Sequence, residues 1–146
     1  MSVLLDVNVL IAILDTRHVH HDFAQDWFLR NGASNWSTCP LTENGAIRIL
    51  SDRTYPNSTN DPAIVIETVA ALRATGIHAF WPDAISLLDS PLIDRRKLAA
   101  SKQVTDSYLL ALAVSRGGRL ATFDRRLSPV AVAGGPEALL ILDNRH

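Results

Sequence analysis

Short apolar segments alternate with helical segments along the chain, and this alternation limits the fold more than any other feature of the sequence. Val3–Leu5 predicts a strand buried on both faces, since all three of its residues are apolar. Strands that alternate with helices predict an α/β domain with a largely parallel sheet and right-handed crossovers. The other strands that we expect are Asn35–Cys39, Ile77–Trp81, Arg119–Thr122 and Leu139–Leu142.

The helical segments between these strands are recognised by their apolar spacing and by the residues at their ends. The clearest helix is followed by Gly117 and Gly118, and Gly32 is a candidate C-cap for an earlier one. No repeat, low-complexity tract or linker divides the 146 residues, so we expect a single domain over residues 1–146. The expected helices are Asn8–Leu14, Asp22–Arg30, Leu41–Leu50, Ala63–Ala74 and Asp106–Arg116.

The composition places the chain among globular proteins of a reducing compartment. Hydrophobic residues make up 47% and charged residues 20%, which is enough apolar material for a core. Cys39 is the only cysteine, which excludes an intramolecular disulfide and any multi-cysteine metal site. The apolar run Val7–Leu14 falls short of a spanning helix of about 20 residues and lacks a basic leader. We therefore expect a cytoplasmic protein without membrane contact.

Four carboxylates stand at the carboxyl ends of expected strands or at the starts of the following helices. Asp6 follows the first strand, Asp124 follows the fourth, and Glu43 and Asp106 each head the apolar face of a helix. Each acid alone has a simpler explanation: a helix cap for Asp6, helix-start electrostatics for Glu43 and Asp106, and a turn for Asp124. A parallel sheet, however, brings all four to one edge.

Four ionised carboxylates at one edge repel one another unless a cation compensates them. Oxygen ligands of this kind suit a hard divalent ion, and Mg²⁺ or Mn²⁺ is the expected cofactor. Such ions activate water and stabilise charge on a phosphate. The pattern thus predicts hydrolysis of a phosphodiester.

The segments around these acids resemble those of the PIN-domain ribonucleases, and in particular the VapC-type toxins of actinobacterial toxin–antitoxin pairs. The resemblance spans nearly the whole chain and implies a three-layer domain with a five-stranded, mainly parallel sheet flanked by helices. It also implies one or two Mg²⁺ or Mn²⁺ ions and endonucleolytic cleavage of structured RNA (tRNA, rRNA or mRNA), which inhibits translation and growth. The matching segments are Leu4–Leu10, Leu41–Gly45, Thr105–Ala113 and Arg119–Asp124.

The resemblance further implies a homodimer, inhibition by a small VapB-type antitoxin, and roles for particular residues. Carried over by position, the catalytic and metal-binding acids are Asp6, Glu43, Asp106 and Asp124. Asn8 and Thr122 are the polar residues expected to orient Asp6 or a bound water.

Basic residues near the third and fourth acids are candidates for contact with the RNA backbone. For the cluster before the third acid, Arg95–Lys97 with Lys102, a solvated helix face is an equally good explanation. Histidines 18, 20 and 21 do not have the spacing of a metal site, so we interpret them as a polar entrance to a helix. The candidate RNA contacts are Arg95, Arg96, Lys97, Lys102, Arg125 and Arg126.

Two other functions compete with this interpretation. A haloacid-dehalogenase-like phosphatase also begins with an aspartate after its first strand, but it needs an acid two residues later, where this chain has Asn8. A PIN-like module that binds RNA or protein without cutting needs no cluster of repelling acids. Metal-dependent cleavage of RNA distinguishes the second alternative from the ribonuclease.

Overall fold

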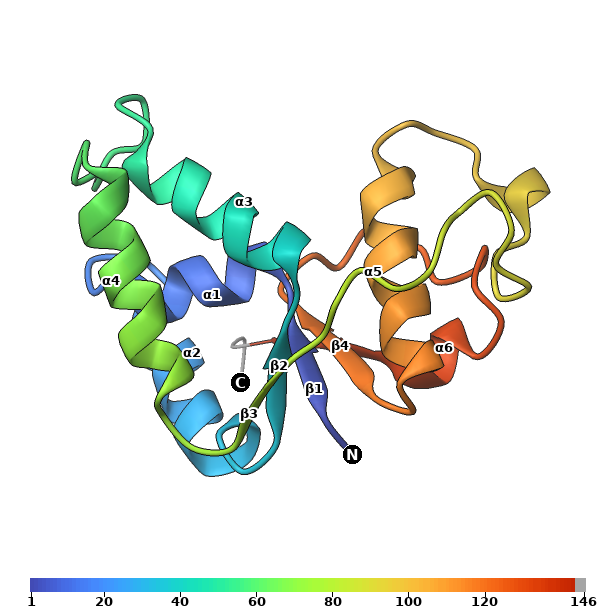
Figure 1. Ribbon diagram of the computed structural model, residues 1–146, viewed down its shortest axis with the longest axis horizontal. Coiled ribbons are helices and arrows are strands. Elements are labelled where there is room, and N and C mark those ends of the chain that lie inside the picture. Colours follow the sequence, from blue (N-terminus) through green and yellow to red (C-terminus); the bar gives the residue numbers. More distant parts are fainter. Residues whose placement is uncertain (144–146) are drawn as a thin grey trace.

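A five-stranded parallel sheet forms the centre of the protein in the computed structural model, which describes residues 1–143 (Figure 1). The strand order is β3-β2-β1-β4-β5, and every neighbouring pair is parallel. The predicted α/β fold with a mainly parallel sheet is therefore confirmed. The strands are β1 (Val3–Leu5), β2 (Trp36–Thr38), β3 (His78–Phe80), β4 (Arg119–Thr122) and β5 (Leu139–Ile141).

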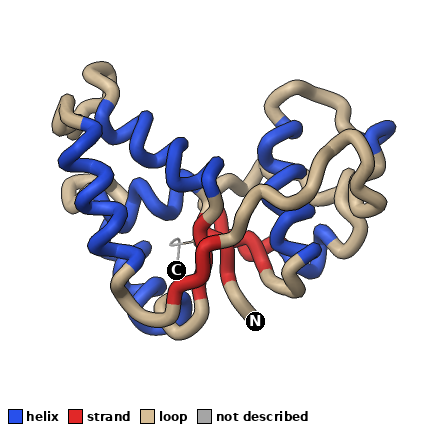
Figure 2. The backbone as a smooth tube through the Cα atoms, viewed as in Figure 1, coloured by secondary structure: helices blue, strands red, loops and turns tan. Residues whose placement is uncertain are grey.

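Helices cover both faces of the sheet and give the domain three layers. The first four α-helices lie on one side of the strands, and α5 and α6 lie on the other side (Figure 1, Figure 2). A π-helical turn, η1, extends α2, and a short 3-10 helix, η2, precedes α5. The helices are α1 (Val7–Leu14), α2 (His21–Trp27), η1 (Phe28–Gly32), α3 (Pro40–Ser51), α4 (Pro62–Arg73), η2 (Arg95–Lys97), α5 (Gln103–Ser115) and α6 (Gly135–Ala138).

The helix ends follow from local sequence. Asp61 caps α4 by accepting a hydrogen bond from the Ala63 amide at 3.0 Å, and Pro62 occupies the first helical position. Gly117, with φ of +67°, follows the last turn of α5, where a glycine is favoured because it lacks a Cβ. These signals explain why most of the expected boundaries lie within a few residues of the observed ones.

Three local expectations were wrong or incomplete. The helix expected over Asp22–Arg30 changes to a π-helical turn at Phe28, and Ala33 rather than Gly32 is the C-cap of that turn. Helix α5 begins at Gln103, three residues before its expected start. The short helices η2 and α6 were not expected, because three or four residues carry too little periodic pattern to be recognised.

The alternation of side chains along β1 divides the core into two parts. Leu5 packs among α1, α2 and α3, whereas Leu4 packs against α5 on the opposite face. Trp36, fully buried in β2, fills the first part, and its indole Nε1 donates a hydrogen bond to the Thr75 carbonyl oxygen at 2.9 Å. Both faces of the sheet are thus anchored by large apolar side chains, which fixes the strand ends from which the candidate site is built.

No helix in residues 1–143 is long and apolar enough to cross a membrane. The expectation of a single domain over residues 1–146 stays a prediction, and its last part, residues 144–146, lies outside the described residues.

Candidate active site

Asp6 lies where β1 ends and α1 begins, and its carboxylate accepts hydrogen bonds from α1 and from β4. Its Oδ1 accepts a hydrogen bond from the Val7 amide at 2.8 Å, so the helix-cap role considered from the sequence is present. Its Oδ2 accepts a hydrogen bond from Thr122 Oγ1 at 2.8 Å. Only 8% of the residue is exposed, and this burial raises the pKa of Asp6, with the negative charge of Asp124 acting in the same direction. The hydrogen bonds oppose that shift but do not cancel it.

Asp106 faces Asp6 and Asp124 from the first turns of α5. Burial, together with the charges of Asp6 and Asp124, raises the pKa of Asp106 to about 6. Within residues 1–143 no side chain or backbone group donates a hydrogen bond to its carboxylate. Three aspartates from three separate segments therefore lie close enough to repel one another, and one of them has no compensating partner.

Asn8 and Thr122 connect the first and fourth acidic segments. Asn8 Nδ2 donates to Thr122 Oγ1 at 3.0 Å, and the Phe123 amide donates to Asn8 Oδ1 at 3.1 Å. Thr122 Oγ1 also accepts from the Asp124 amide at 3.1 Å while its hydroxyl hydrogen points to Asp6. The two residues named from the sequence as supporting groups thus tie the end of β4 to the start of α1.

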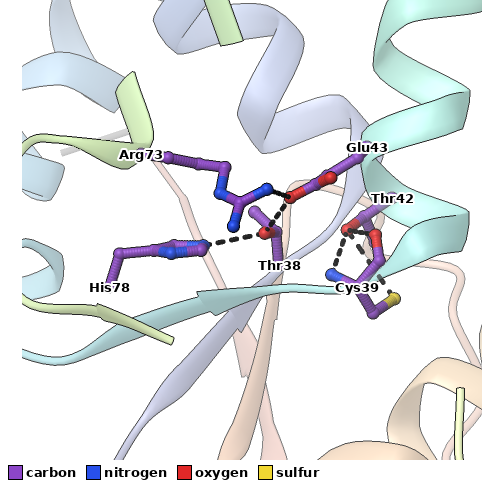
Figure 3. A network of polar contacts seen from close by, with 6 residues as sticks. All are labelled: Thr38, Cys39, Thr42, Glu43, Arg73 and His78. Atoms are coloured by element: carbon purple, nitrogen blue, oxygen red, sulfur yellow. Dashed lines mark hydrogen bonds and ion pairs between the residues drawn. The ribbon is translucent and has the colours of Figure 1, made fainter. Parts of the chain in front are cut away.

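Glu43 is placed differently from the three aspartates (Figure 3). Its Oε2 accepts a hydrogen bond from Thr38 Oγ1 at 2.6 Å and lies 3.2 Å from Nη1 of Arg73. Thr38 is in turn 2.8 Å from Nε2 of His78. The sequence analysis missed Arg73 because it stands at the end of α4, 30 residues from Glu43, with no local pattern that marks it.

The four acids therefore do not form one group in this structure. Asp6, Asp106 and Asp124 interact electrostatically, whereas Glu43 is held in its own network. In the described part of the chain, no three His, Cys, Asp or Glu side chains are grouped so that they could hold a metal ion together. The electrostatic contacts join the three aspartates, and Glu43 contacts Thr38 and Arg73 instead. The catalytic and metal-binding roles expected for the four acids stay predictions.

The chemistry of the aspartates nevertheless fits a hard divalent cation. All the donor atoms are carboxylate or amide oxygens, which are the ligands that Mg²⁺ and Mn²⁺ prefer. The Asp106 carboxylate, half-buried and without a hydrogen-bond donor in residues 1–143, has the free lone pairs that such an ion uses. Asp6 and Asp106 would hold the ion first, with Asp124 beside them.

The basic residues predicted to contact RNA divide into two places. Lys102 and Arg126 line a pocket of about 260 Å³ together with Asp106 and Asp124. The cluster 95–97 on η2 lines a separate pocket of about 520 Å³ with the 130–133 segment. Arg125 is exposed beside Asp124. Two of the six candidates therefore share a pocket with Asp106 and Asp124, and Arg125 is next to Asp124 in the chain.

The three histidines lie at the entrance to α2, as interpreted from the sequence. His20 precedes the first residue of the helix, and its ring stacks on Phe123 with centroids 5.1 Å apart. His21 is buried, with Nδ1 2.8 Å from the Ala12 carbonyl oxygen. The rings of His18 and His20 also lie near each other, with centroids 5.7 Å apart. These positions agree with the interpretation of the three residues as a helix entrance.

Comparison with known proteins identifies the family. A PIN domain matches residues 3–133. Ribonuclease VapC44 of Mycobacterium tuberculosis is 45% identical over 134 residues, which cover 92% of this chain and 94% of the relative. Ribonuclease VapC39 of the same species is 45% identical over 139 residues, or 95% of this chain and 100% of the relative.

A solved structure shows the same fold. The crystal structure of Mycobacterium tuberculosis VapC20, described as a Sarcin-Ricin loop cleaving toxin, superposes with a TM-score of 0.63 at 13% identity. The match covers 90% of this chain and 96% of the VapC20 chain. The resemblance noted from the four acidic segments is thus confirmed, and the chain belongs to the PIN-domain family, in which its relatives are VapC ribonucleases.

Proposed function

We propose that this protein is a metal-dependent endoribonuclease that acts as the toxin of a toxin–antitoxin pair. The observation that carries the proposal is the trio of mutually repelling aspartates, Asp6, Asp106 and Asp124, next to the cations of Lys102 and Arg126. Acidic groups that bind a cation and basic groups that bind phosphate are both needed to cut a phosphodiester. The ribonuclease names of the relatives at 45% identity support the same activity.

Each residue has a definite task in this proposal. When bound, Mg²⁺ or Mn²⁺ supplies charge stabilisation at the phosphate and activation of the attacking water. Asp6 and Asp106 hold the ion, and Asp124 and Glu43 complete the acidic site. Thr122 and Asn8 fix the orientation of the Asp6 carboxylate through the hydrogen bonds described above. This fixed Asp6 reduces the reorganisation that binding would otherwise require.

The cations near the acids hold the RNA. Lys102 and Arg126 share the pocket of Asp106 and Asp124, so we assign them to the phosphate next to the cleaved bond. Arg125 extends this surface. The cluster Arg95, Arg96 and Lys97 borders the larger pocket and would bind the backbone at a distance from the cut. Structured RNA is the expected substrate, recognised by shape and by unstacked bases.

The proposal includes the partners that the family resemblance implies. The active protein is a homodimer in the cytoplasm, and a VapB-type antitoxin neutralises it. An acidic rim attracts a basic side chain, so the antitoxin is expected to place an arginine or lysine near Asp6 and Asp106. The names of the VapC relatives support this assignment to toxin–antitoxin pairs.

Cleavage by purified variants tests the enzymatic assignment. Wild-type protein should cut structured RNA with Mg²⁺ or Mn²⁺ and not with EDTA, whereas Asp6→Asn and Asp106→Asn should lose at least about 100-fold in rate. Asp89→Asn is the matched control, because Asp89 is an exposed loop residue and its replacement changes net charge equally. Full cleavage by both site variants would refute the proposal. Tight binding of RNA by wild type without metal-dependent cleavage would favour the non-cutting PIN-like module.

A further inference from the structure

We propose that Arg73 is an internal counter-ion that holds Glu43 apart from the three aspartates, and that this ion pair opens when Glu43 joins a bound divalent cation. The inference rests on the metal-dependent function proposed above. It assigns a role to a residue outside the four acidic segments and explains why one of the four acids lies in a different network.

The geometry shows how Glu43 is held (Figure 3). Arg73 reaches from the last turn of α4 to the first turn of α3 and places Nη1 3.2 Å from Glu43 Oε2. Thr38, at the end of β2, donates its hydroxyl hydrogen to the same oxygen at 2.6 Å. Oε2 therefore accepts one hydrogen bond and lies beside one cation, whereas Oε1 accepts no hydrogen bond from any residue in 1–143. Glu43 is fixed through one oxygen and keeps the other available.

Of these two partners, Thr38 is the more firmly fixed. Its residue is fully buried, and because its hydroxyl hydrogen is used for Glu43, His78 Nε2 must donate to Thr38 Oγ1 at 2.8 Å. A chain of donors from β3 to β2 thus directs the Thr38 hydroxyl at Glu43. Thr38 will keep this direction whether or not Arg73 is present.

Arg73 is the partner that is able to leave. Its side chain is 41% exposed, against 15% for Glu43, and it contacts the carboxylate through a single nitrogen atom. The guanidinium also lies over the exposed Phe80 ring, 5.2 Å from its centroid. This cation–π contact can hold the Arg73 cation when the ion pair with Glu43 opens. Ion pairs of this exposure are weak, and opening one is a small cost.

The consequence is a competition for the Glu43 carboxylate. Arg73 and a divalent cation both need its negative charge, so the free energy of the Arg73–Glu43 pair is subtracted from the free energy of metal binding. Removal of Arg73 should therefore strengthen metal binding. The expected gain is about fivefold in affinity, because a partly exposed ion pair contributes about 1 kcal/mol and 1.4 kcal/mol corresponds to a factor of ten.

Titration of the purified protein with Mn²⁺, in the absence of RNA, measures this gain in affinity directly. We would compare wild type with Arg73→Met by calorimetry at 0.15 M salt, a concentration that screens distant charges beyond about 8 Å. Arg30→Met is the matched control, since Arg30 forms an exposed ion pair with Asp26 at 2.8 Å on the α2–η1 segment and its loss changes net charge equally. Arg73→Gln is a second variant of the same charge, should Arg73→Met fold poorly.

The expected results are a tighter Mn²⁺ complex for Arg73→Met and Arg73→Gln and an unchanged one for Arg30→Met. In a Glu43→Gln background, Arg73→Met should no longer alter Mn²⁺ affinity, because the carboxylate for which Arg73 and Mn²⁺ compete is absent. Unchanged or weaker Mn²⁺ binding by the Arg73 variants would overturn the proposed competition between Arg73 and the cation, and would leave the metal-dependent function standing. If wild type takes up no Mn²⁺, the metal-dependent function itself fails, which is a different outcome from the same titration.

Discussion

Replacement of Asp106 by asparagine should stabilise the metal-free protein at neutral pH and remove much of its pH dependence. Burial and the charges of Asp6 and Asp124 raise the pKa of Asp106 to about 6, above the value near 3.9 of an unfolded aspartate. The folded state therefore binds the Asp106 proton more tightly than the unfolded state does. As the pH rises from about 4 to about 6, this carboxyl ionises in the folded protein and stability falls.

The size of this effect follows from the two pKa values. A shift of about two units corresponds to about 3 kcal/mol at 1.36 kcal/mol per unit. Because the Asp106 carboxylate is only half-buried, solvent screening reduces the expected penalty to about 1 kcal/mol. Asparagine has nearly the same shape and carries no charge, so it removes the penalty without opening a cavity.

Urea unfolding in EDTA at pH 4.5 and pH 7.5 provides the assay. The free energy of unfolding of wild type should drop by about 1 kcal/mol more than that of Asp106→Asn between these pH values, while Asp89→Asn should behave as wild type. Mn²⁺ should then stabilise wild type and leave Asp106→Asn nearly unchanged. An Asp106→Asn protein that is no more stable than wild type at pH 7.5, or that keeps the same pH dependence, would show that the Asp106 charge does not destabilise the folded state.

Three further predictions concern neighbours of the site and the fold. Thr122→Val should raise the pKa of Asp6 further and cost about 1–2 kcal/mol, because it removes a buried hydroxyl that donates to the carboxylate; NMR titration and urea unfolding measure the two effects. Gly76→Ala should destabilise by at least about 2 kcal/mol in thermal unfolding, since φ is +66° and the added Cβ would lie 2.1 Å from the Ala33 carbonyl oxygen. Arg126→Ala should weaken RNA binding to an Asp106→Asn background and lower its salt dependence by about one phosphate contact.

The sequence was informative about the fold wherever local patterns act alone. Val3–Leu5 is apolar on both faces and is a central strand, and Asp6 after it is both a helix cap and a residue of the candidate site. Asp106 could be named as a candidate because its spacing to the apolar residues of α5 places it toward the sheet. Periodicity along one element was sufficient for these residues.

The remaining features depend on contacts between distant segments. Arg73 at the end of α4 forms an ion pair with Glu43 of α3. No local pattern around a single arginine at a helix end indicates which distant acid it contacts. The division of the basic residues has the same cause: Lys102 lines one pocket with Asp124 because the loop after β4 folds beside the start of α5. Such pairings are set by tertiary packing and not by local propensity.

We propose that Asp6 and Asp106 bind a divalent cation on which RNA cleavage depends. The most direct test is an anomalous difference map from crystals of the wild-type protein soaked in Mn²⁺, with crystals of Asp106→Asn soaked in the same way. We expect a Mn²⁺ peak within coordination distance of carboxylate oxygens of both Asp6 and Asp106 in wild type, and the loss of this peak in the variant. The absence of a peak at these carboxylates in wild type, or an equally strong peak in Asp106→Asn, would show that the two aspartates do not form the cation site.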